Sequence, residues 1–223
     1  MANKVSQREL LRQKKIEKAR KQRLTYIGII SGITVLLLGI IFIPQLFKKN
    51  TIVPNQAGLS LGDPNAPLQV VNFSDFRCSH CRTFALESEP DFIKNYVDTG
   101  KVFLTFAPLT FMSEDSIDAA EAAYCAADQN SFWEYKDILY GAATSATAFT
   151  ETNLVNYAKQ LDLDEDAFVT CLSDNRHLSA IEDDAAYADS VGVTGTPSFY
   201  VNGKVVYSNE LINAVDSALG TQN

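Results

Sequence analysis

Two cysteines of this chain have the spacing and the neighbours of a redox-active pair. Cys78 and Cys81 are separated by two residues, at the point where an apolar strand-like run passes into a helix-like run. Cys78 should therefore begin the helix, with its sulfur near backbone N–H groups that lack a partner in the first turn. The helix dipole and the basic neighbours Arg77, His80 and Arg82 also favour negative charge at that sulfur. The pattern predicts thiol–disulfide chemistry and a lowered pKa for Cys78.

Other uses of these two cysteines fit the sequence less well. A purely structural disulfide does not require a position at the start of a helix. A zinc site would need two further ligands at finger-like spacing, and only Cys125, Cys171 and His177 remain as candidates. The chain also lacks a Walker loop, an H-E-x-x-H pair, a G-x-S-x-G elbow and a dinucleotide fingerprint. We therefore predict no metal and no cofactor.

The other two cysteines, Cys125 and Cys171, lie 46 positions apart on predicted helices. The simpler interpretation is a structural disulfide, which would contribute about 4 kcal/mol in the loop-entropy model. The alternative is an electron relay or a redox regulator.

The redox pair needs a folded frame, and the pattern of apolar residues predicts an α/β domain. Strands rich in Val and Phe flank a long stretch of Ala-rich amphipathic helices, so we expect an all-helical insertion at about residues 113–190. The chain should then return to a strand that lies beside the first one. The expected elements are a strand at 67–74, a helix at 79–97, a strand at 101–106, the insertion, a hairpin at 198–207 with its turn at Asn202-Gly203, and a helix at 209–219.

The segment before this domain predicts a membrane anchor. Residues 24–47 form a run of 24 residues without a charge, and a helix of that length reaches ~36 Å, enough to cross a bilayer. A cleaved signal peptide is the alternative, but its apolar region usually has only ~7–15 residues. Nine Lys and Arg in residues 1–23 predict a cytoplasmic N-terminus and an exported C-terminal domain.

Charge divides the chain in the same way. Residues 1–23 carry nine basic residues against two acidic ones, or +7, whereas residues 51–223 carry eight against twenty-five, or −17. A domain of that charge repels nucleic acid, so we predict no nucleic-acid partner. All four cysteines lie on the expected exported side, where disulfides persist. The predicted domains are a basic tail at 1–23, an anchor at 24–47, a linker at 48–66 and a folded domain at 67–223.

Three motifs together resemble the DsbA-like thiol:disulfide oxidoreductases, including their membrane-anchored bacterial forms. The motifs are Gly62-Asp-Pro-Asn-Ala-Pro67, Phe73-Ser-Asp-Phe-Arg-Cys-Ser-His-Cys81 and Gly195-Thr-Pro-Ser-Phe-Tyr-Val-Asn-Gly203. The resemblance covers most of residues 60–220. It implies a thioredoxin-like fold with a helical insertion between the second and third strands. The chain departs from the family at Ser79, where the commonest DsbA-like sequence has proline.

The resemblance also implies roles for individual residues. Cys78 matches the exposed nucleophile, Cys81 its buried partner, and His80 the histidine that stabilises the thiolate. Pro197 matches the cis-proline of the family, although a trans proline at the start of a strand is the commoner case elsewhere. Thr196 would then face the active-site sulfur and present backbone polar groups to an extended substrate segment.

The expected function is the introduction of disulfide bonds into reduced exported proteins. The resemblance implies a reoxidising partner, a membrane quinone reductase of the DsbB or vitamin K epoxide reductase type. One alternative is a membrane-anchored reductase or isomerase, which Thr196 before Pro197 slightly favours, although isomerases of this group usually carry a separate dimerisation domain. Another alternative is a non-catalytic thioredoxin-fold binding module.

Overall fold

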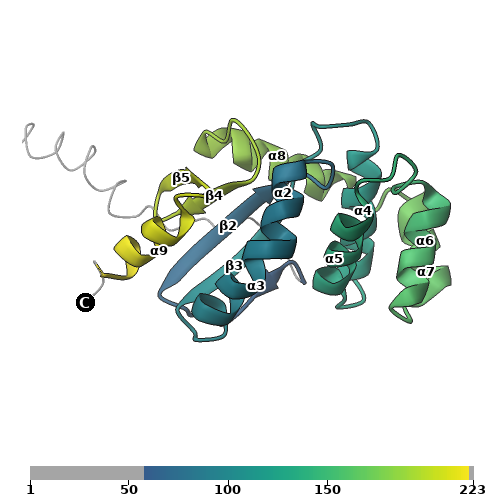
Figure 1. Ribbon diagram of the computed structural model, residues 1–223. Helices are drawn as coiled ribbons and strands as arrows, with labels where there is room; N and C mark the ends of the chain where they lie inside the picture. The colour runs from purple at the N-terminus through teal and green to yellow at the C-terminus, as the bar shows by residue number, and fades with distance from the viewer. Residues whose placement is uncertain (1–57, 221–223) are drawn as a thin grey trace, which may run out of the picture. The chain divides into compact units, whose positions relative to one another are not determined.

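The computed structural model describes residues 58–220, which form an α/β domain (Figure 1). Its strands are β1 (Ser60–Leu61), β2 (Leu68–Ser74), β3 (Val102–Pro108), β4 (Ser198–Val201) and β5 (Lys204–Tyr207). Its α-helices are α2 (Ser79–Thr83), α3 (Glu89–Phe92), α4 (Ser116–Ala127), α5 (Phe132–Ala142), α6 (Glu151–Gln160), α7 (Glu165–Ser173), α8 (Leu178–Val191) and α9 (Leu211–Gly220). Two π-helical turns, η1 (Phe84–Ser88) and η2 (Ile93–Val97), continue α2 and α3.

The strands form one sheet in the order β1-β3-β2-β4-β5. The central strand β2 runs parallel to β3 and antiparallel to β4. This pairing confirms the expectation that the strand after Pro197 lies beside the first long strand. The β4–β5 hairpin turns at Asn202 and Gly203, whose positive φ values of 46° and 83° suit the residue types that the turn was predicted to use.

Helices cover both faces of the sheet because alternate strand residues point to opposite sides. On one face, Val70 of β2 packs in a cluster with Phe84 of η1 and Val215 of α9. On the other face, Phe73 of β2 packs in a cluster with Ala188 of α8. The strand that leads to the active site is therefore buried on both sides, which fixes the position of its carboxyl end.

The predicted all-helical insertion is confirmed between β3 and β4. Helices α4 to α7 stand together beyond the sheet, and α8 leads the chain back to it (Figure 1). All six alanines of α4 are buried in a core with aromatic residues of α5 and α7, such as Phe132, Tyr135 and Phe168. Small residues let these helices approach closely, which explains the Ala-rich composition. The same core includes Phe76 and Cys81, so the insertion packs directly against the redox pair.

The predicted helix at 79–97 is one continuous helical run, but it is not a regular α-helix. The run passes through α2, η1, α3 and η2 in chain order, so α-helical and π-helical segments alternate. Pro90 lies inside this run, where it removes a backbone donor that a regular helix would use. Wide turns of this kind are local insertions in a helix, and apolar spacing does not reveal them.

The folded domain begins before Pro67, where we had placed the end of a linker. Ser60 and Leu61 pair antiparallel with Thr105 and Leu104 of β3. Gly62 then turns the chain with a φ of 96°, and a Cβ there would lie 2.7 Å from the Val102 carbonyl oxygen. Only two residues form this strand, so it has too few positions for an apolar alternation to show in the sequence.

The predicted tail at 1–23, the predicted membrane helix at 24–47 and most of the predicted linker lie outside the described residues. Between residues 58 and 220, none of the helices has the length and apolar character needed to cross a membrane.

Candidate active site

The redox pair lies where β2 ends and the helical run begins. Cys78 is the N-cap residue of α2, with extended backbone, and Cys81 lies in its first turn. Both are free thiols. Cys81 is 1% exposed, as expected of the buried partner, but Cys78, expected to be the exposed nucleophile, is itself only 4% exposed. The backbone N–H of Cys78 donates to the Asp75 carbonyl at 3.0 Å, which closes the loop before the helix. The sequence therefore located both the pair and the helix start.

The two thiols have opposite acidities. The pKa of Cys78 is lowered to about 5, mainly by a hydrogen bond from the Cys81 side chain. The Thr196 side chain and the backbone N–H groups of Cys81 and His80 contribute to this lowering, and burial opposes it. For Cys81, burial and the hydrogen bond to Cys78 raise the pKa far above its usual value. At neutral pH the pair therefore holds one thiolate on Cys78 and one proton on Cys81.

The Thr196–Pro197 peptide is cis, and it lies against the redox pair. The Cys78 sulfur lies 3.4 Å from the Thr196 carbonyl oxygen. A groove of about 380 Å³ begins here, and it is lined by His80, Pro197, Tyr207 and their neighbours. The structure thus brings Cys78, Cys81, His80, Thr196 and Pro197 together at one end of the sheet.

Two basic residues do not act as we predicted. The Arg77 guanidinium points into the insertion, where Nε contacts Asp115 at 3.0 Å and Nη1 donates to the Ala143 carbonyl at 2.9 Å. Arg82 donates from Nε to the Tyr140 carbonyl at 2.9 Å. These side chains therefore tie the redox loop and α2 to the insertion, and neither is among the causes that lower the pKa of Cys78. The hydrogen bond that His80 gives the Cys78 sulfur comes from its backbone N–H.

Asp75 is a buried acid beside the redox pair. It precedes Cys78 by three positions, a placement that in the sequence alone fits a solvent-exposed loop acid. The structure buries it completely, and its carboxylate accepts from the backbone N–H of Arg77 at 2.8 Å, from that of Met112 at 3.0 Å and from the Ser116 hydroxyl at 2.8 Å. Burial raises its pKa despite these hydrogen bonds. Asp75 ties the redox loop to the start of α4.

A buried ion pair between Glu89 and Lys136 also escaped the sequence analysis. Lys136 Nζ lies 2.6 Å from Glu89 Oε2, and the two side chains are 1% and 2% exposed. Asn72 of β2 donates to Glu89 at 3.4 Å, and the Ser74 hydroxyl donates to Asn72 at 2.7 Å. No spacing rule links residues 47 positions apart, so only the fold could reveal this network between β2, α3 and α5.

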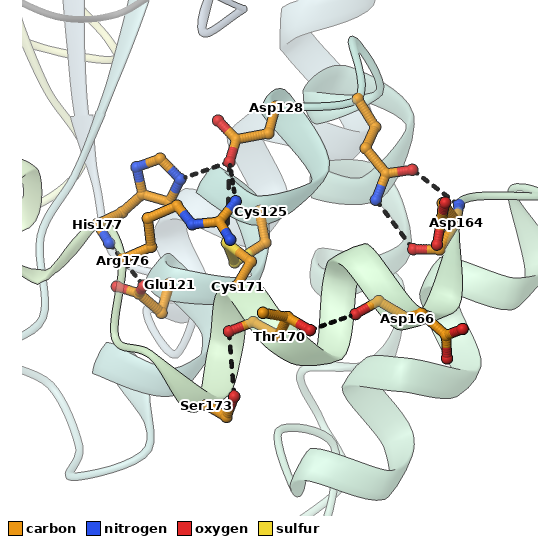
Figure 2. The surroundings of a disulfide bond; sticks show 11 residues. Glu121, Cys125, Asp128, Asp164, Asp166, Thr170, Cys171, Ser173, Arg176 and His177 are labelled. Carbon is orange, nitrogen blue, oxygen red and sulfur yellow. Dashed lines mark hydrogen bonds and ion pairs between the residues drawn. A yellow bond between two sulfur atoms is a disulfide. The ribbon is translucent and has the colours of Figure 1, made fainter.

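The remaining cysteines form a disulfide between α4 and α7. The Cys125–Cys171 bond has a Cα–Cα distance of 5.8 Å, and both residues are 1% exposed. Figure 2 shows Asp128, Arg176 and His177 gathered beside it. The His177 ring stacks on Tyr124 with centroids 5.2 Å apart, and its Nε2 atom lies 2.9 Å from Asp128 Oδ2.

Comparisons with known proteins agree with this geometry. A family model described as thioredoxin matches residues 54–220. Probable disulfide bond formation protein D of Bacillus anthracis is 33% identical, over 88% of this chain and 97% of that protein. The crystal structure of oxidised BdbD from Bacillus subtilis is 26% identical with a TM-score of 0.64, covering 75% of this chain and 96% of that one. Na(+)/H(+) antiporter NhaA 3 of Salinispora tropica is 36% identical over 71% of this chain, which spans only 24% of the antiporter.

Proposed function

This chain belongs to the thioredoxin family, in which it is a DsbA-like protein thiol:disulfide oxidoreductase, and we propose that it introduces disulfide bonds into exported proteins through Cys78 and Cys81. The observation that carries the proposal is the opposite acidity of the two thiols. A Cys78 thiolate of low pKa is a good leaving group and stabilises the reduced protein. Both effects favour transfer of the disulfide to a substrate.

The chemistry runs through two exchange steps. In the oxidised protein, a substrate thiolate attacks the Cys78 sulfur, the Cys78–Cys81 bond breaks, and Cys81 leaves and takes up a proton because its pKa is high. A second substrate thiolate then attacks the substrate sulfur of the mixed disulfide, and Cys78 leaves as a stable thiolate. Two electrons pass from the substrate dithiol to the protein, and the substrate gains a disulfide.

Thr196 and the groove beside it would hold the substrate. The Thr196 carbonyl lies 3.4 Å from the Cys78 sulfur, so a peptide paired with the backbone at Thr196 would bring its cysteine to that sulfur. His80 and Pro197 line the groove in which neighbouring substrate residues would lie. These residues therefore bind and orient the substrate, whereas Cys78 and Cys81 carry the electrons.

The membrane segment and the partner belong to the same proposal. The uncharged run at 24–47, with nine basic residues before it, supports a single membrane span that places the redox domain outside the cytoplasm. The reduced protein would be reoxidised by a membrane quinone reductase of the DsbB or vitamin K epoxide reductase type. Labelling intact cells with a membrane-impermeant maleimide tests the topology, because reduced Cys78 should react only if the domain is exported.

Oxidative refolding of a reduced secretory protein tests the function. The oxidised full-length protein should restore the disulfides of that substrate, and Cys78→Ala should abolish this activity. The Ser79→Ala variant is the matched control, because Ser79 is exposed beside Cys78 and carries no electrons. Retained activity in Cys78→Ala would instead support the binding-module alternative.

A further inference from the structure

The surroundings of the Cys125–Cys171 disulfide hold more donor groups than a structural bridge requires. The two sulfurs and a ring nitrogen of His177 all lie within 4.8 Å of one another. Asp128 Oδ2 lies 2.9 Å from His177 Nε2 and 3.9 Å from the Cys171 sulfur. Figure 2 shows these side chains converging from α4, α7 and the turn before α8. Two sulfurs and one nitrogen thus lie close together, and the Asp128 carboxylate lies beside the nitrogen and one of the two sulfurs.

This donor set matches the ligands that zinc prefers. Zinc binds cysteine thiolates, histidine nitrogens and carboxylate oxygens, usually four of them in a tetrahedron. With bonds of about 2.0–2.3 Å, the ligand atoms of such a tetrahedron lie roughly 3.3–3.8 Å apart. The distances from Asp128 to His177 and to Cys171 bracket this range. On reduction the two bonded sulfurs would have to separate, and the four side chains would have to adjust around the ion.

The charges around the cluster also suit a cation. Two thiolates and the Asp128 carboxylate would carry three negative charges, and a zinc ion would leave one of them. Arg176 Nη1 lies 3.4 Å from Asp128 Oδ2 and offsets that remaining charge. Glu121 holds the backbone N–H of His177 at 2.7 Å, and its Oε2 atom is buried without a hydrogen-bond partner. Glu121 therefore ties the backbone of His177 to α4, while the His177 ring is held by Asp128.

We propose that the reduced Cys125 and Cys171 thiolates, together with His177 and Asp128, form a zinc site that replaces the disulfide as the link between α4 and α7. Reduction adds two electrons and two protons to the disulfide and gives two thiols. Zinc binding then releases the two thiol protons and forms two sulfur–zinc bonds. The oxidised protein has no free sulfur here, so zinc binding depends on the redox state of this pair. The proposal does not depend on the function of Cys78 and Cys81.

The experiment uses the full-length chain with Cys78→Ser and Cys81→Ser, which removes the other two thiols. A phosphine reduces the remaining disulfide, while water supplies the oxygen of the phosphine oxide and the two thiol protons. Zinc is then titrated against a chromophoric chelator under anaerobic conditions, in parallel with the oxidised protein. The reduced protein should bind one zinc ion per chain, and the oxidised protein should bind none with comparable affinity. Cobalt in place of zinc should give thiolate-to-metal charge-transfer absorption.

A matched pair of variants tests the ligands. The chain has only two histidines, so His177→Ala removes the proposed ligand and His80→Ala serves as the control. His177→Ala should lower the zinc affinity of the reduced protein by at least ~100-fold. Loss of a residue that only contacts a metal ligand already costs up to ~100-fold, and His177 would bind the metal itself. His80→Ala should leave the affinity unchanged. Equal affinities in the two variants would overturn the site.

Thermal unfolding provides a readout that needs no substitution in the cluster. Zinc should raise the melting temperature of the reduced protein and leave that of the oxidised protein unchanged, because a ligand stabilises only the state that binds it. A reduced protein that neither binds zinc nor melts at a higher temperature in its presence would overturn the proposal. Oxidative refolding by the chain with Cys78 and Cys81 intact is measured separately, so a failed zinc site leaves the proposed function untouched.

Discussion

At the scale of single residues, the Cys78 thiolate depends most on one neighbour, the thiol of Cys81. Replacing Cys81 with Ala removes that hydrogen bond, so the pKa of Cys78 should rise from about 5 toward the ~8.5 of an ordinary cysteine. The rate of alkylation of reduced Cys78, followed against pH, reports this pKa. Ser79→Ala is the control and should keep the wild-type profile. A wild-type profile centred near pH ~8.5, or one that Cys81→Ala leaves unchanged, would contradict the account.

The same thiolate makes the stability of the reduced protein depend on pH. Folding lowers the pKa of Cys78 from 9.0 to about 5, so its stabilising effect is complete above pH ~9 and disappears as the pH falls through about 5. Cys81 does not contribute to the pH dependence of stability below pH ~8, because it stays protonated in both the folded and the unfolded protein there.

The melting temperature of the reduced protein, minus that of the oxidised protein, should therefore increase from pH ~5 to pH ~8. The oxidised protein serves as the reference because its Cys78 does not titrate. A difference that is flat or decreases over this range would mean that the fold does not stabilise the thiolate.

At the scale of elements, the redox loop is held by the helical insertion. Asp75 accepts from Met112 and Ser116, and Arg77 contacts Asp115 and donates to the Ala143 carbonyl. The insertion therefore does more than cover one end of the sheet, because its first helix and its α5–α6 connection fix the residues that precede Cys78.

The buried Glu89–Lys136 ion pair joins α3 to α5. Lys136→Met leaves Glu89 buried without its cation and should lower the free energy of unfolding by ~3–5 kcal/mol. Adding Glu89→Gln removes the uncompensated charge and should recover most of that loss. Lys159→Met breaks an ion pair whose side chains are 49% and 48% exposed, so it should change stability by no more than ~0.5 kcal/mol. Urea unfolding of the four proteins measures these differences, and equal losses in Lys136→Met and Lys159→Met would contradict the role of burial.

What the sequence could predict at this scale follows from periodicity. Local patterns of apolar residues or turn formers predicted the strands around β2, the helix start at Cys78 and the all-helical insertion. No local pattern predicts the burial of Asp75, the contacts of Arg77 or the Glu89–Lys136 pair, because each depends on which segments meet in the fold. A carboxylate three residues before a predicted helix N-cap was the one available signal for Asp75, and it fits an exposed acid equally well.

At the scale of the whole molecule, the Cys125–Cys171 bond links α4 to α7 inside the insertion core. Replacing both cysteines with Ala should lower the free energy of unfolding by ~2–4 kcal/mol and leave oxidative refolding activity unchanged at a temperature where the variant is folded. Denaturant unfolding and the refolding assay measure the two effects on the same preparation. Lower activity with an unchanged melting temperature would instead support an electron relay.

The direction of electron flow is a property of the whole molecule, and it is the central claim. The reduction potential of Cys78–Cys81 tests it most directly. We would equilibrate the full-length protein against glutathione buffers, with Cys125 and Cys171 intact, and quantify alkylated Cys78 by mass spectrometry. The account predicts a potential near the ~−120 mV of a strong oxidant, and a value near the ~−270 mV of thioredoxin would contradict it.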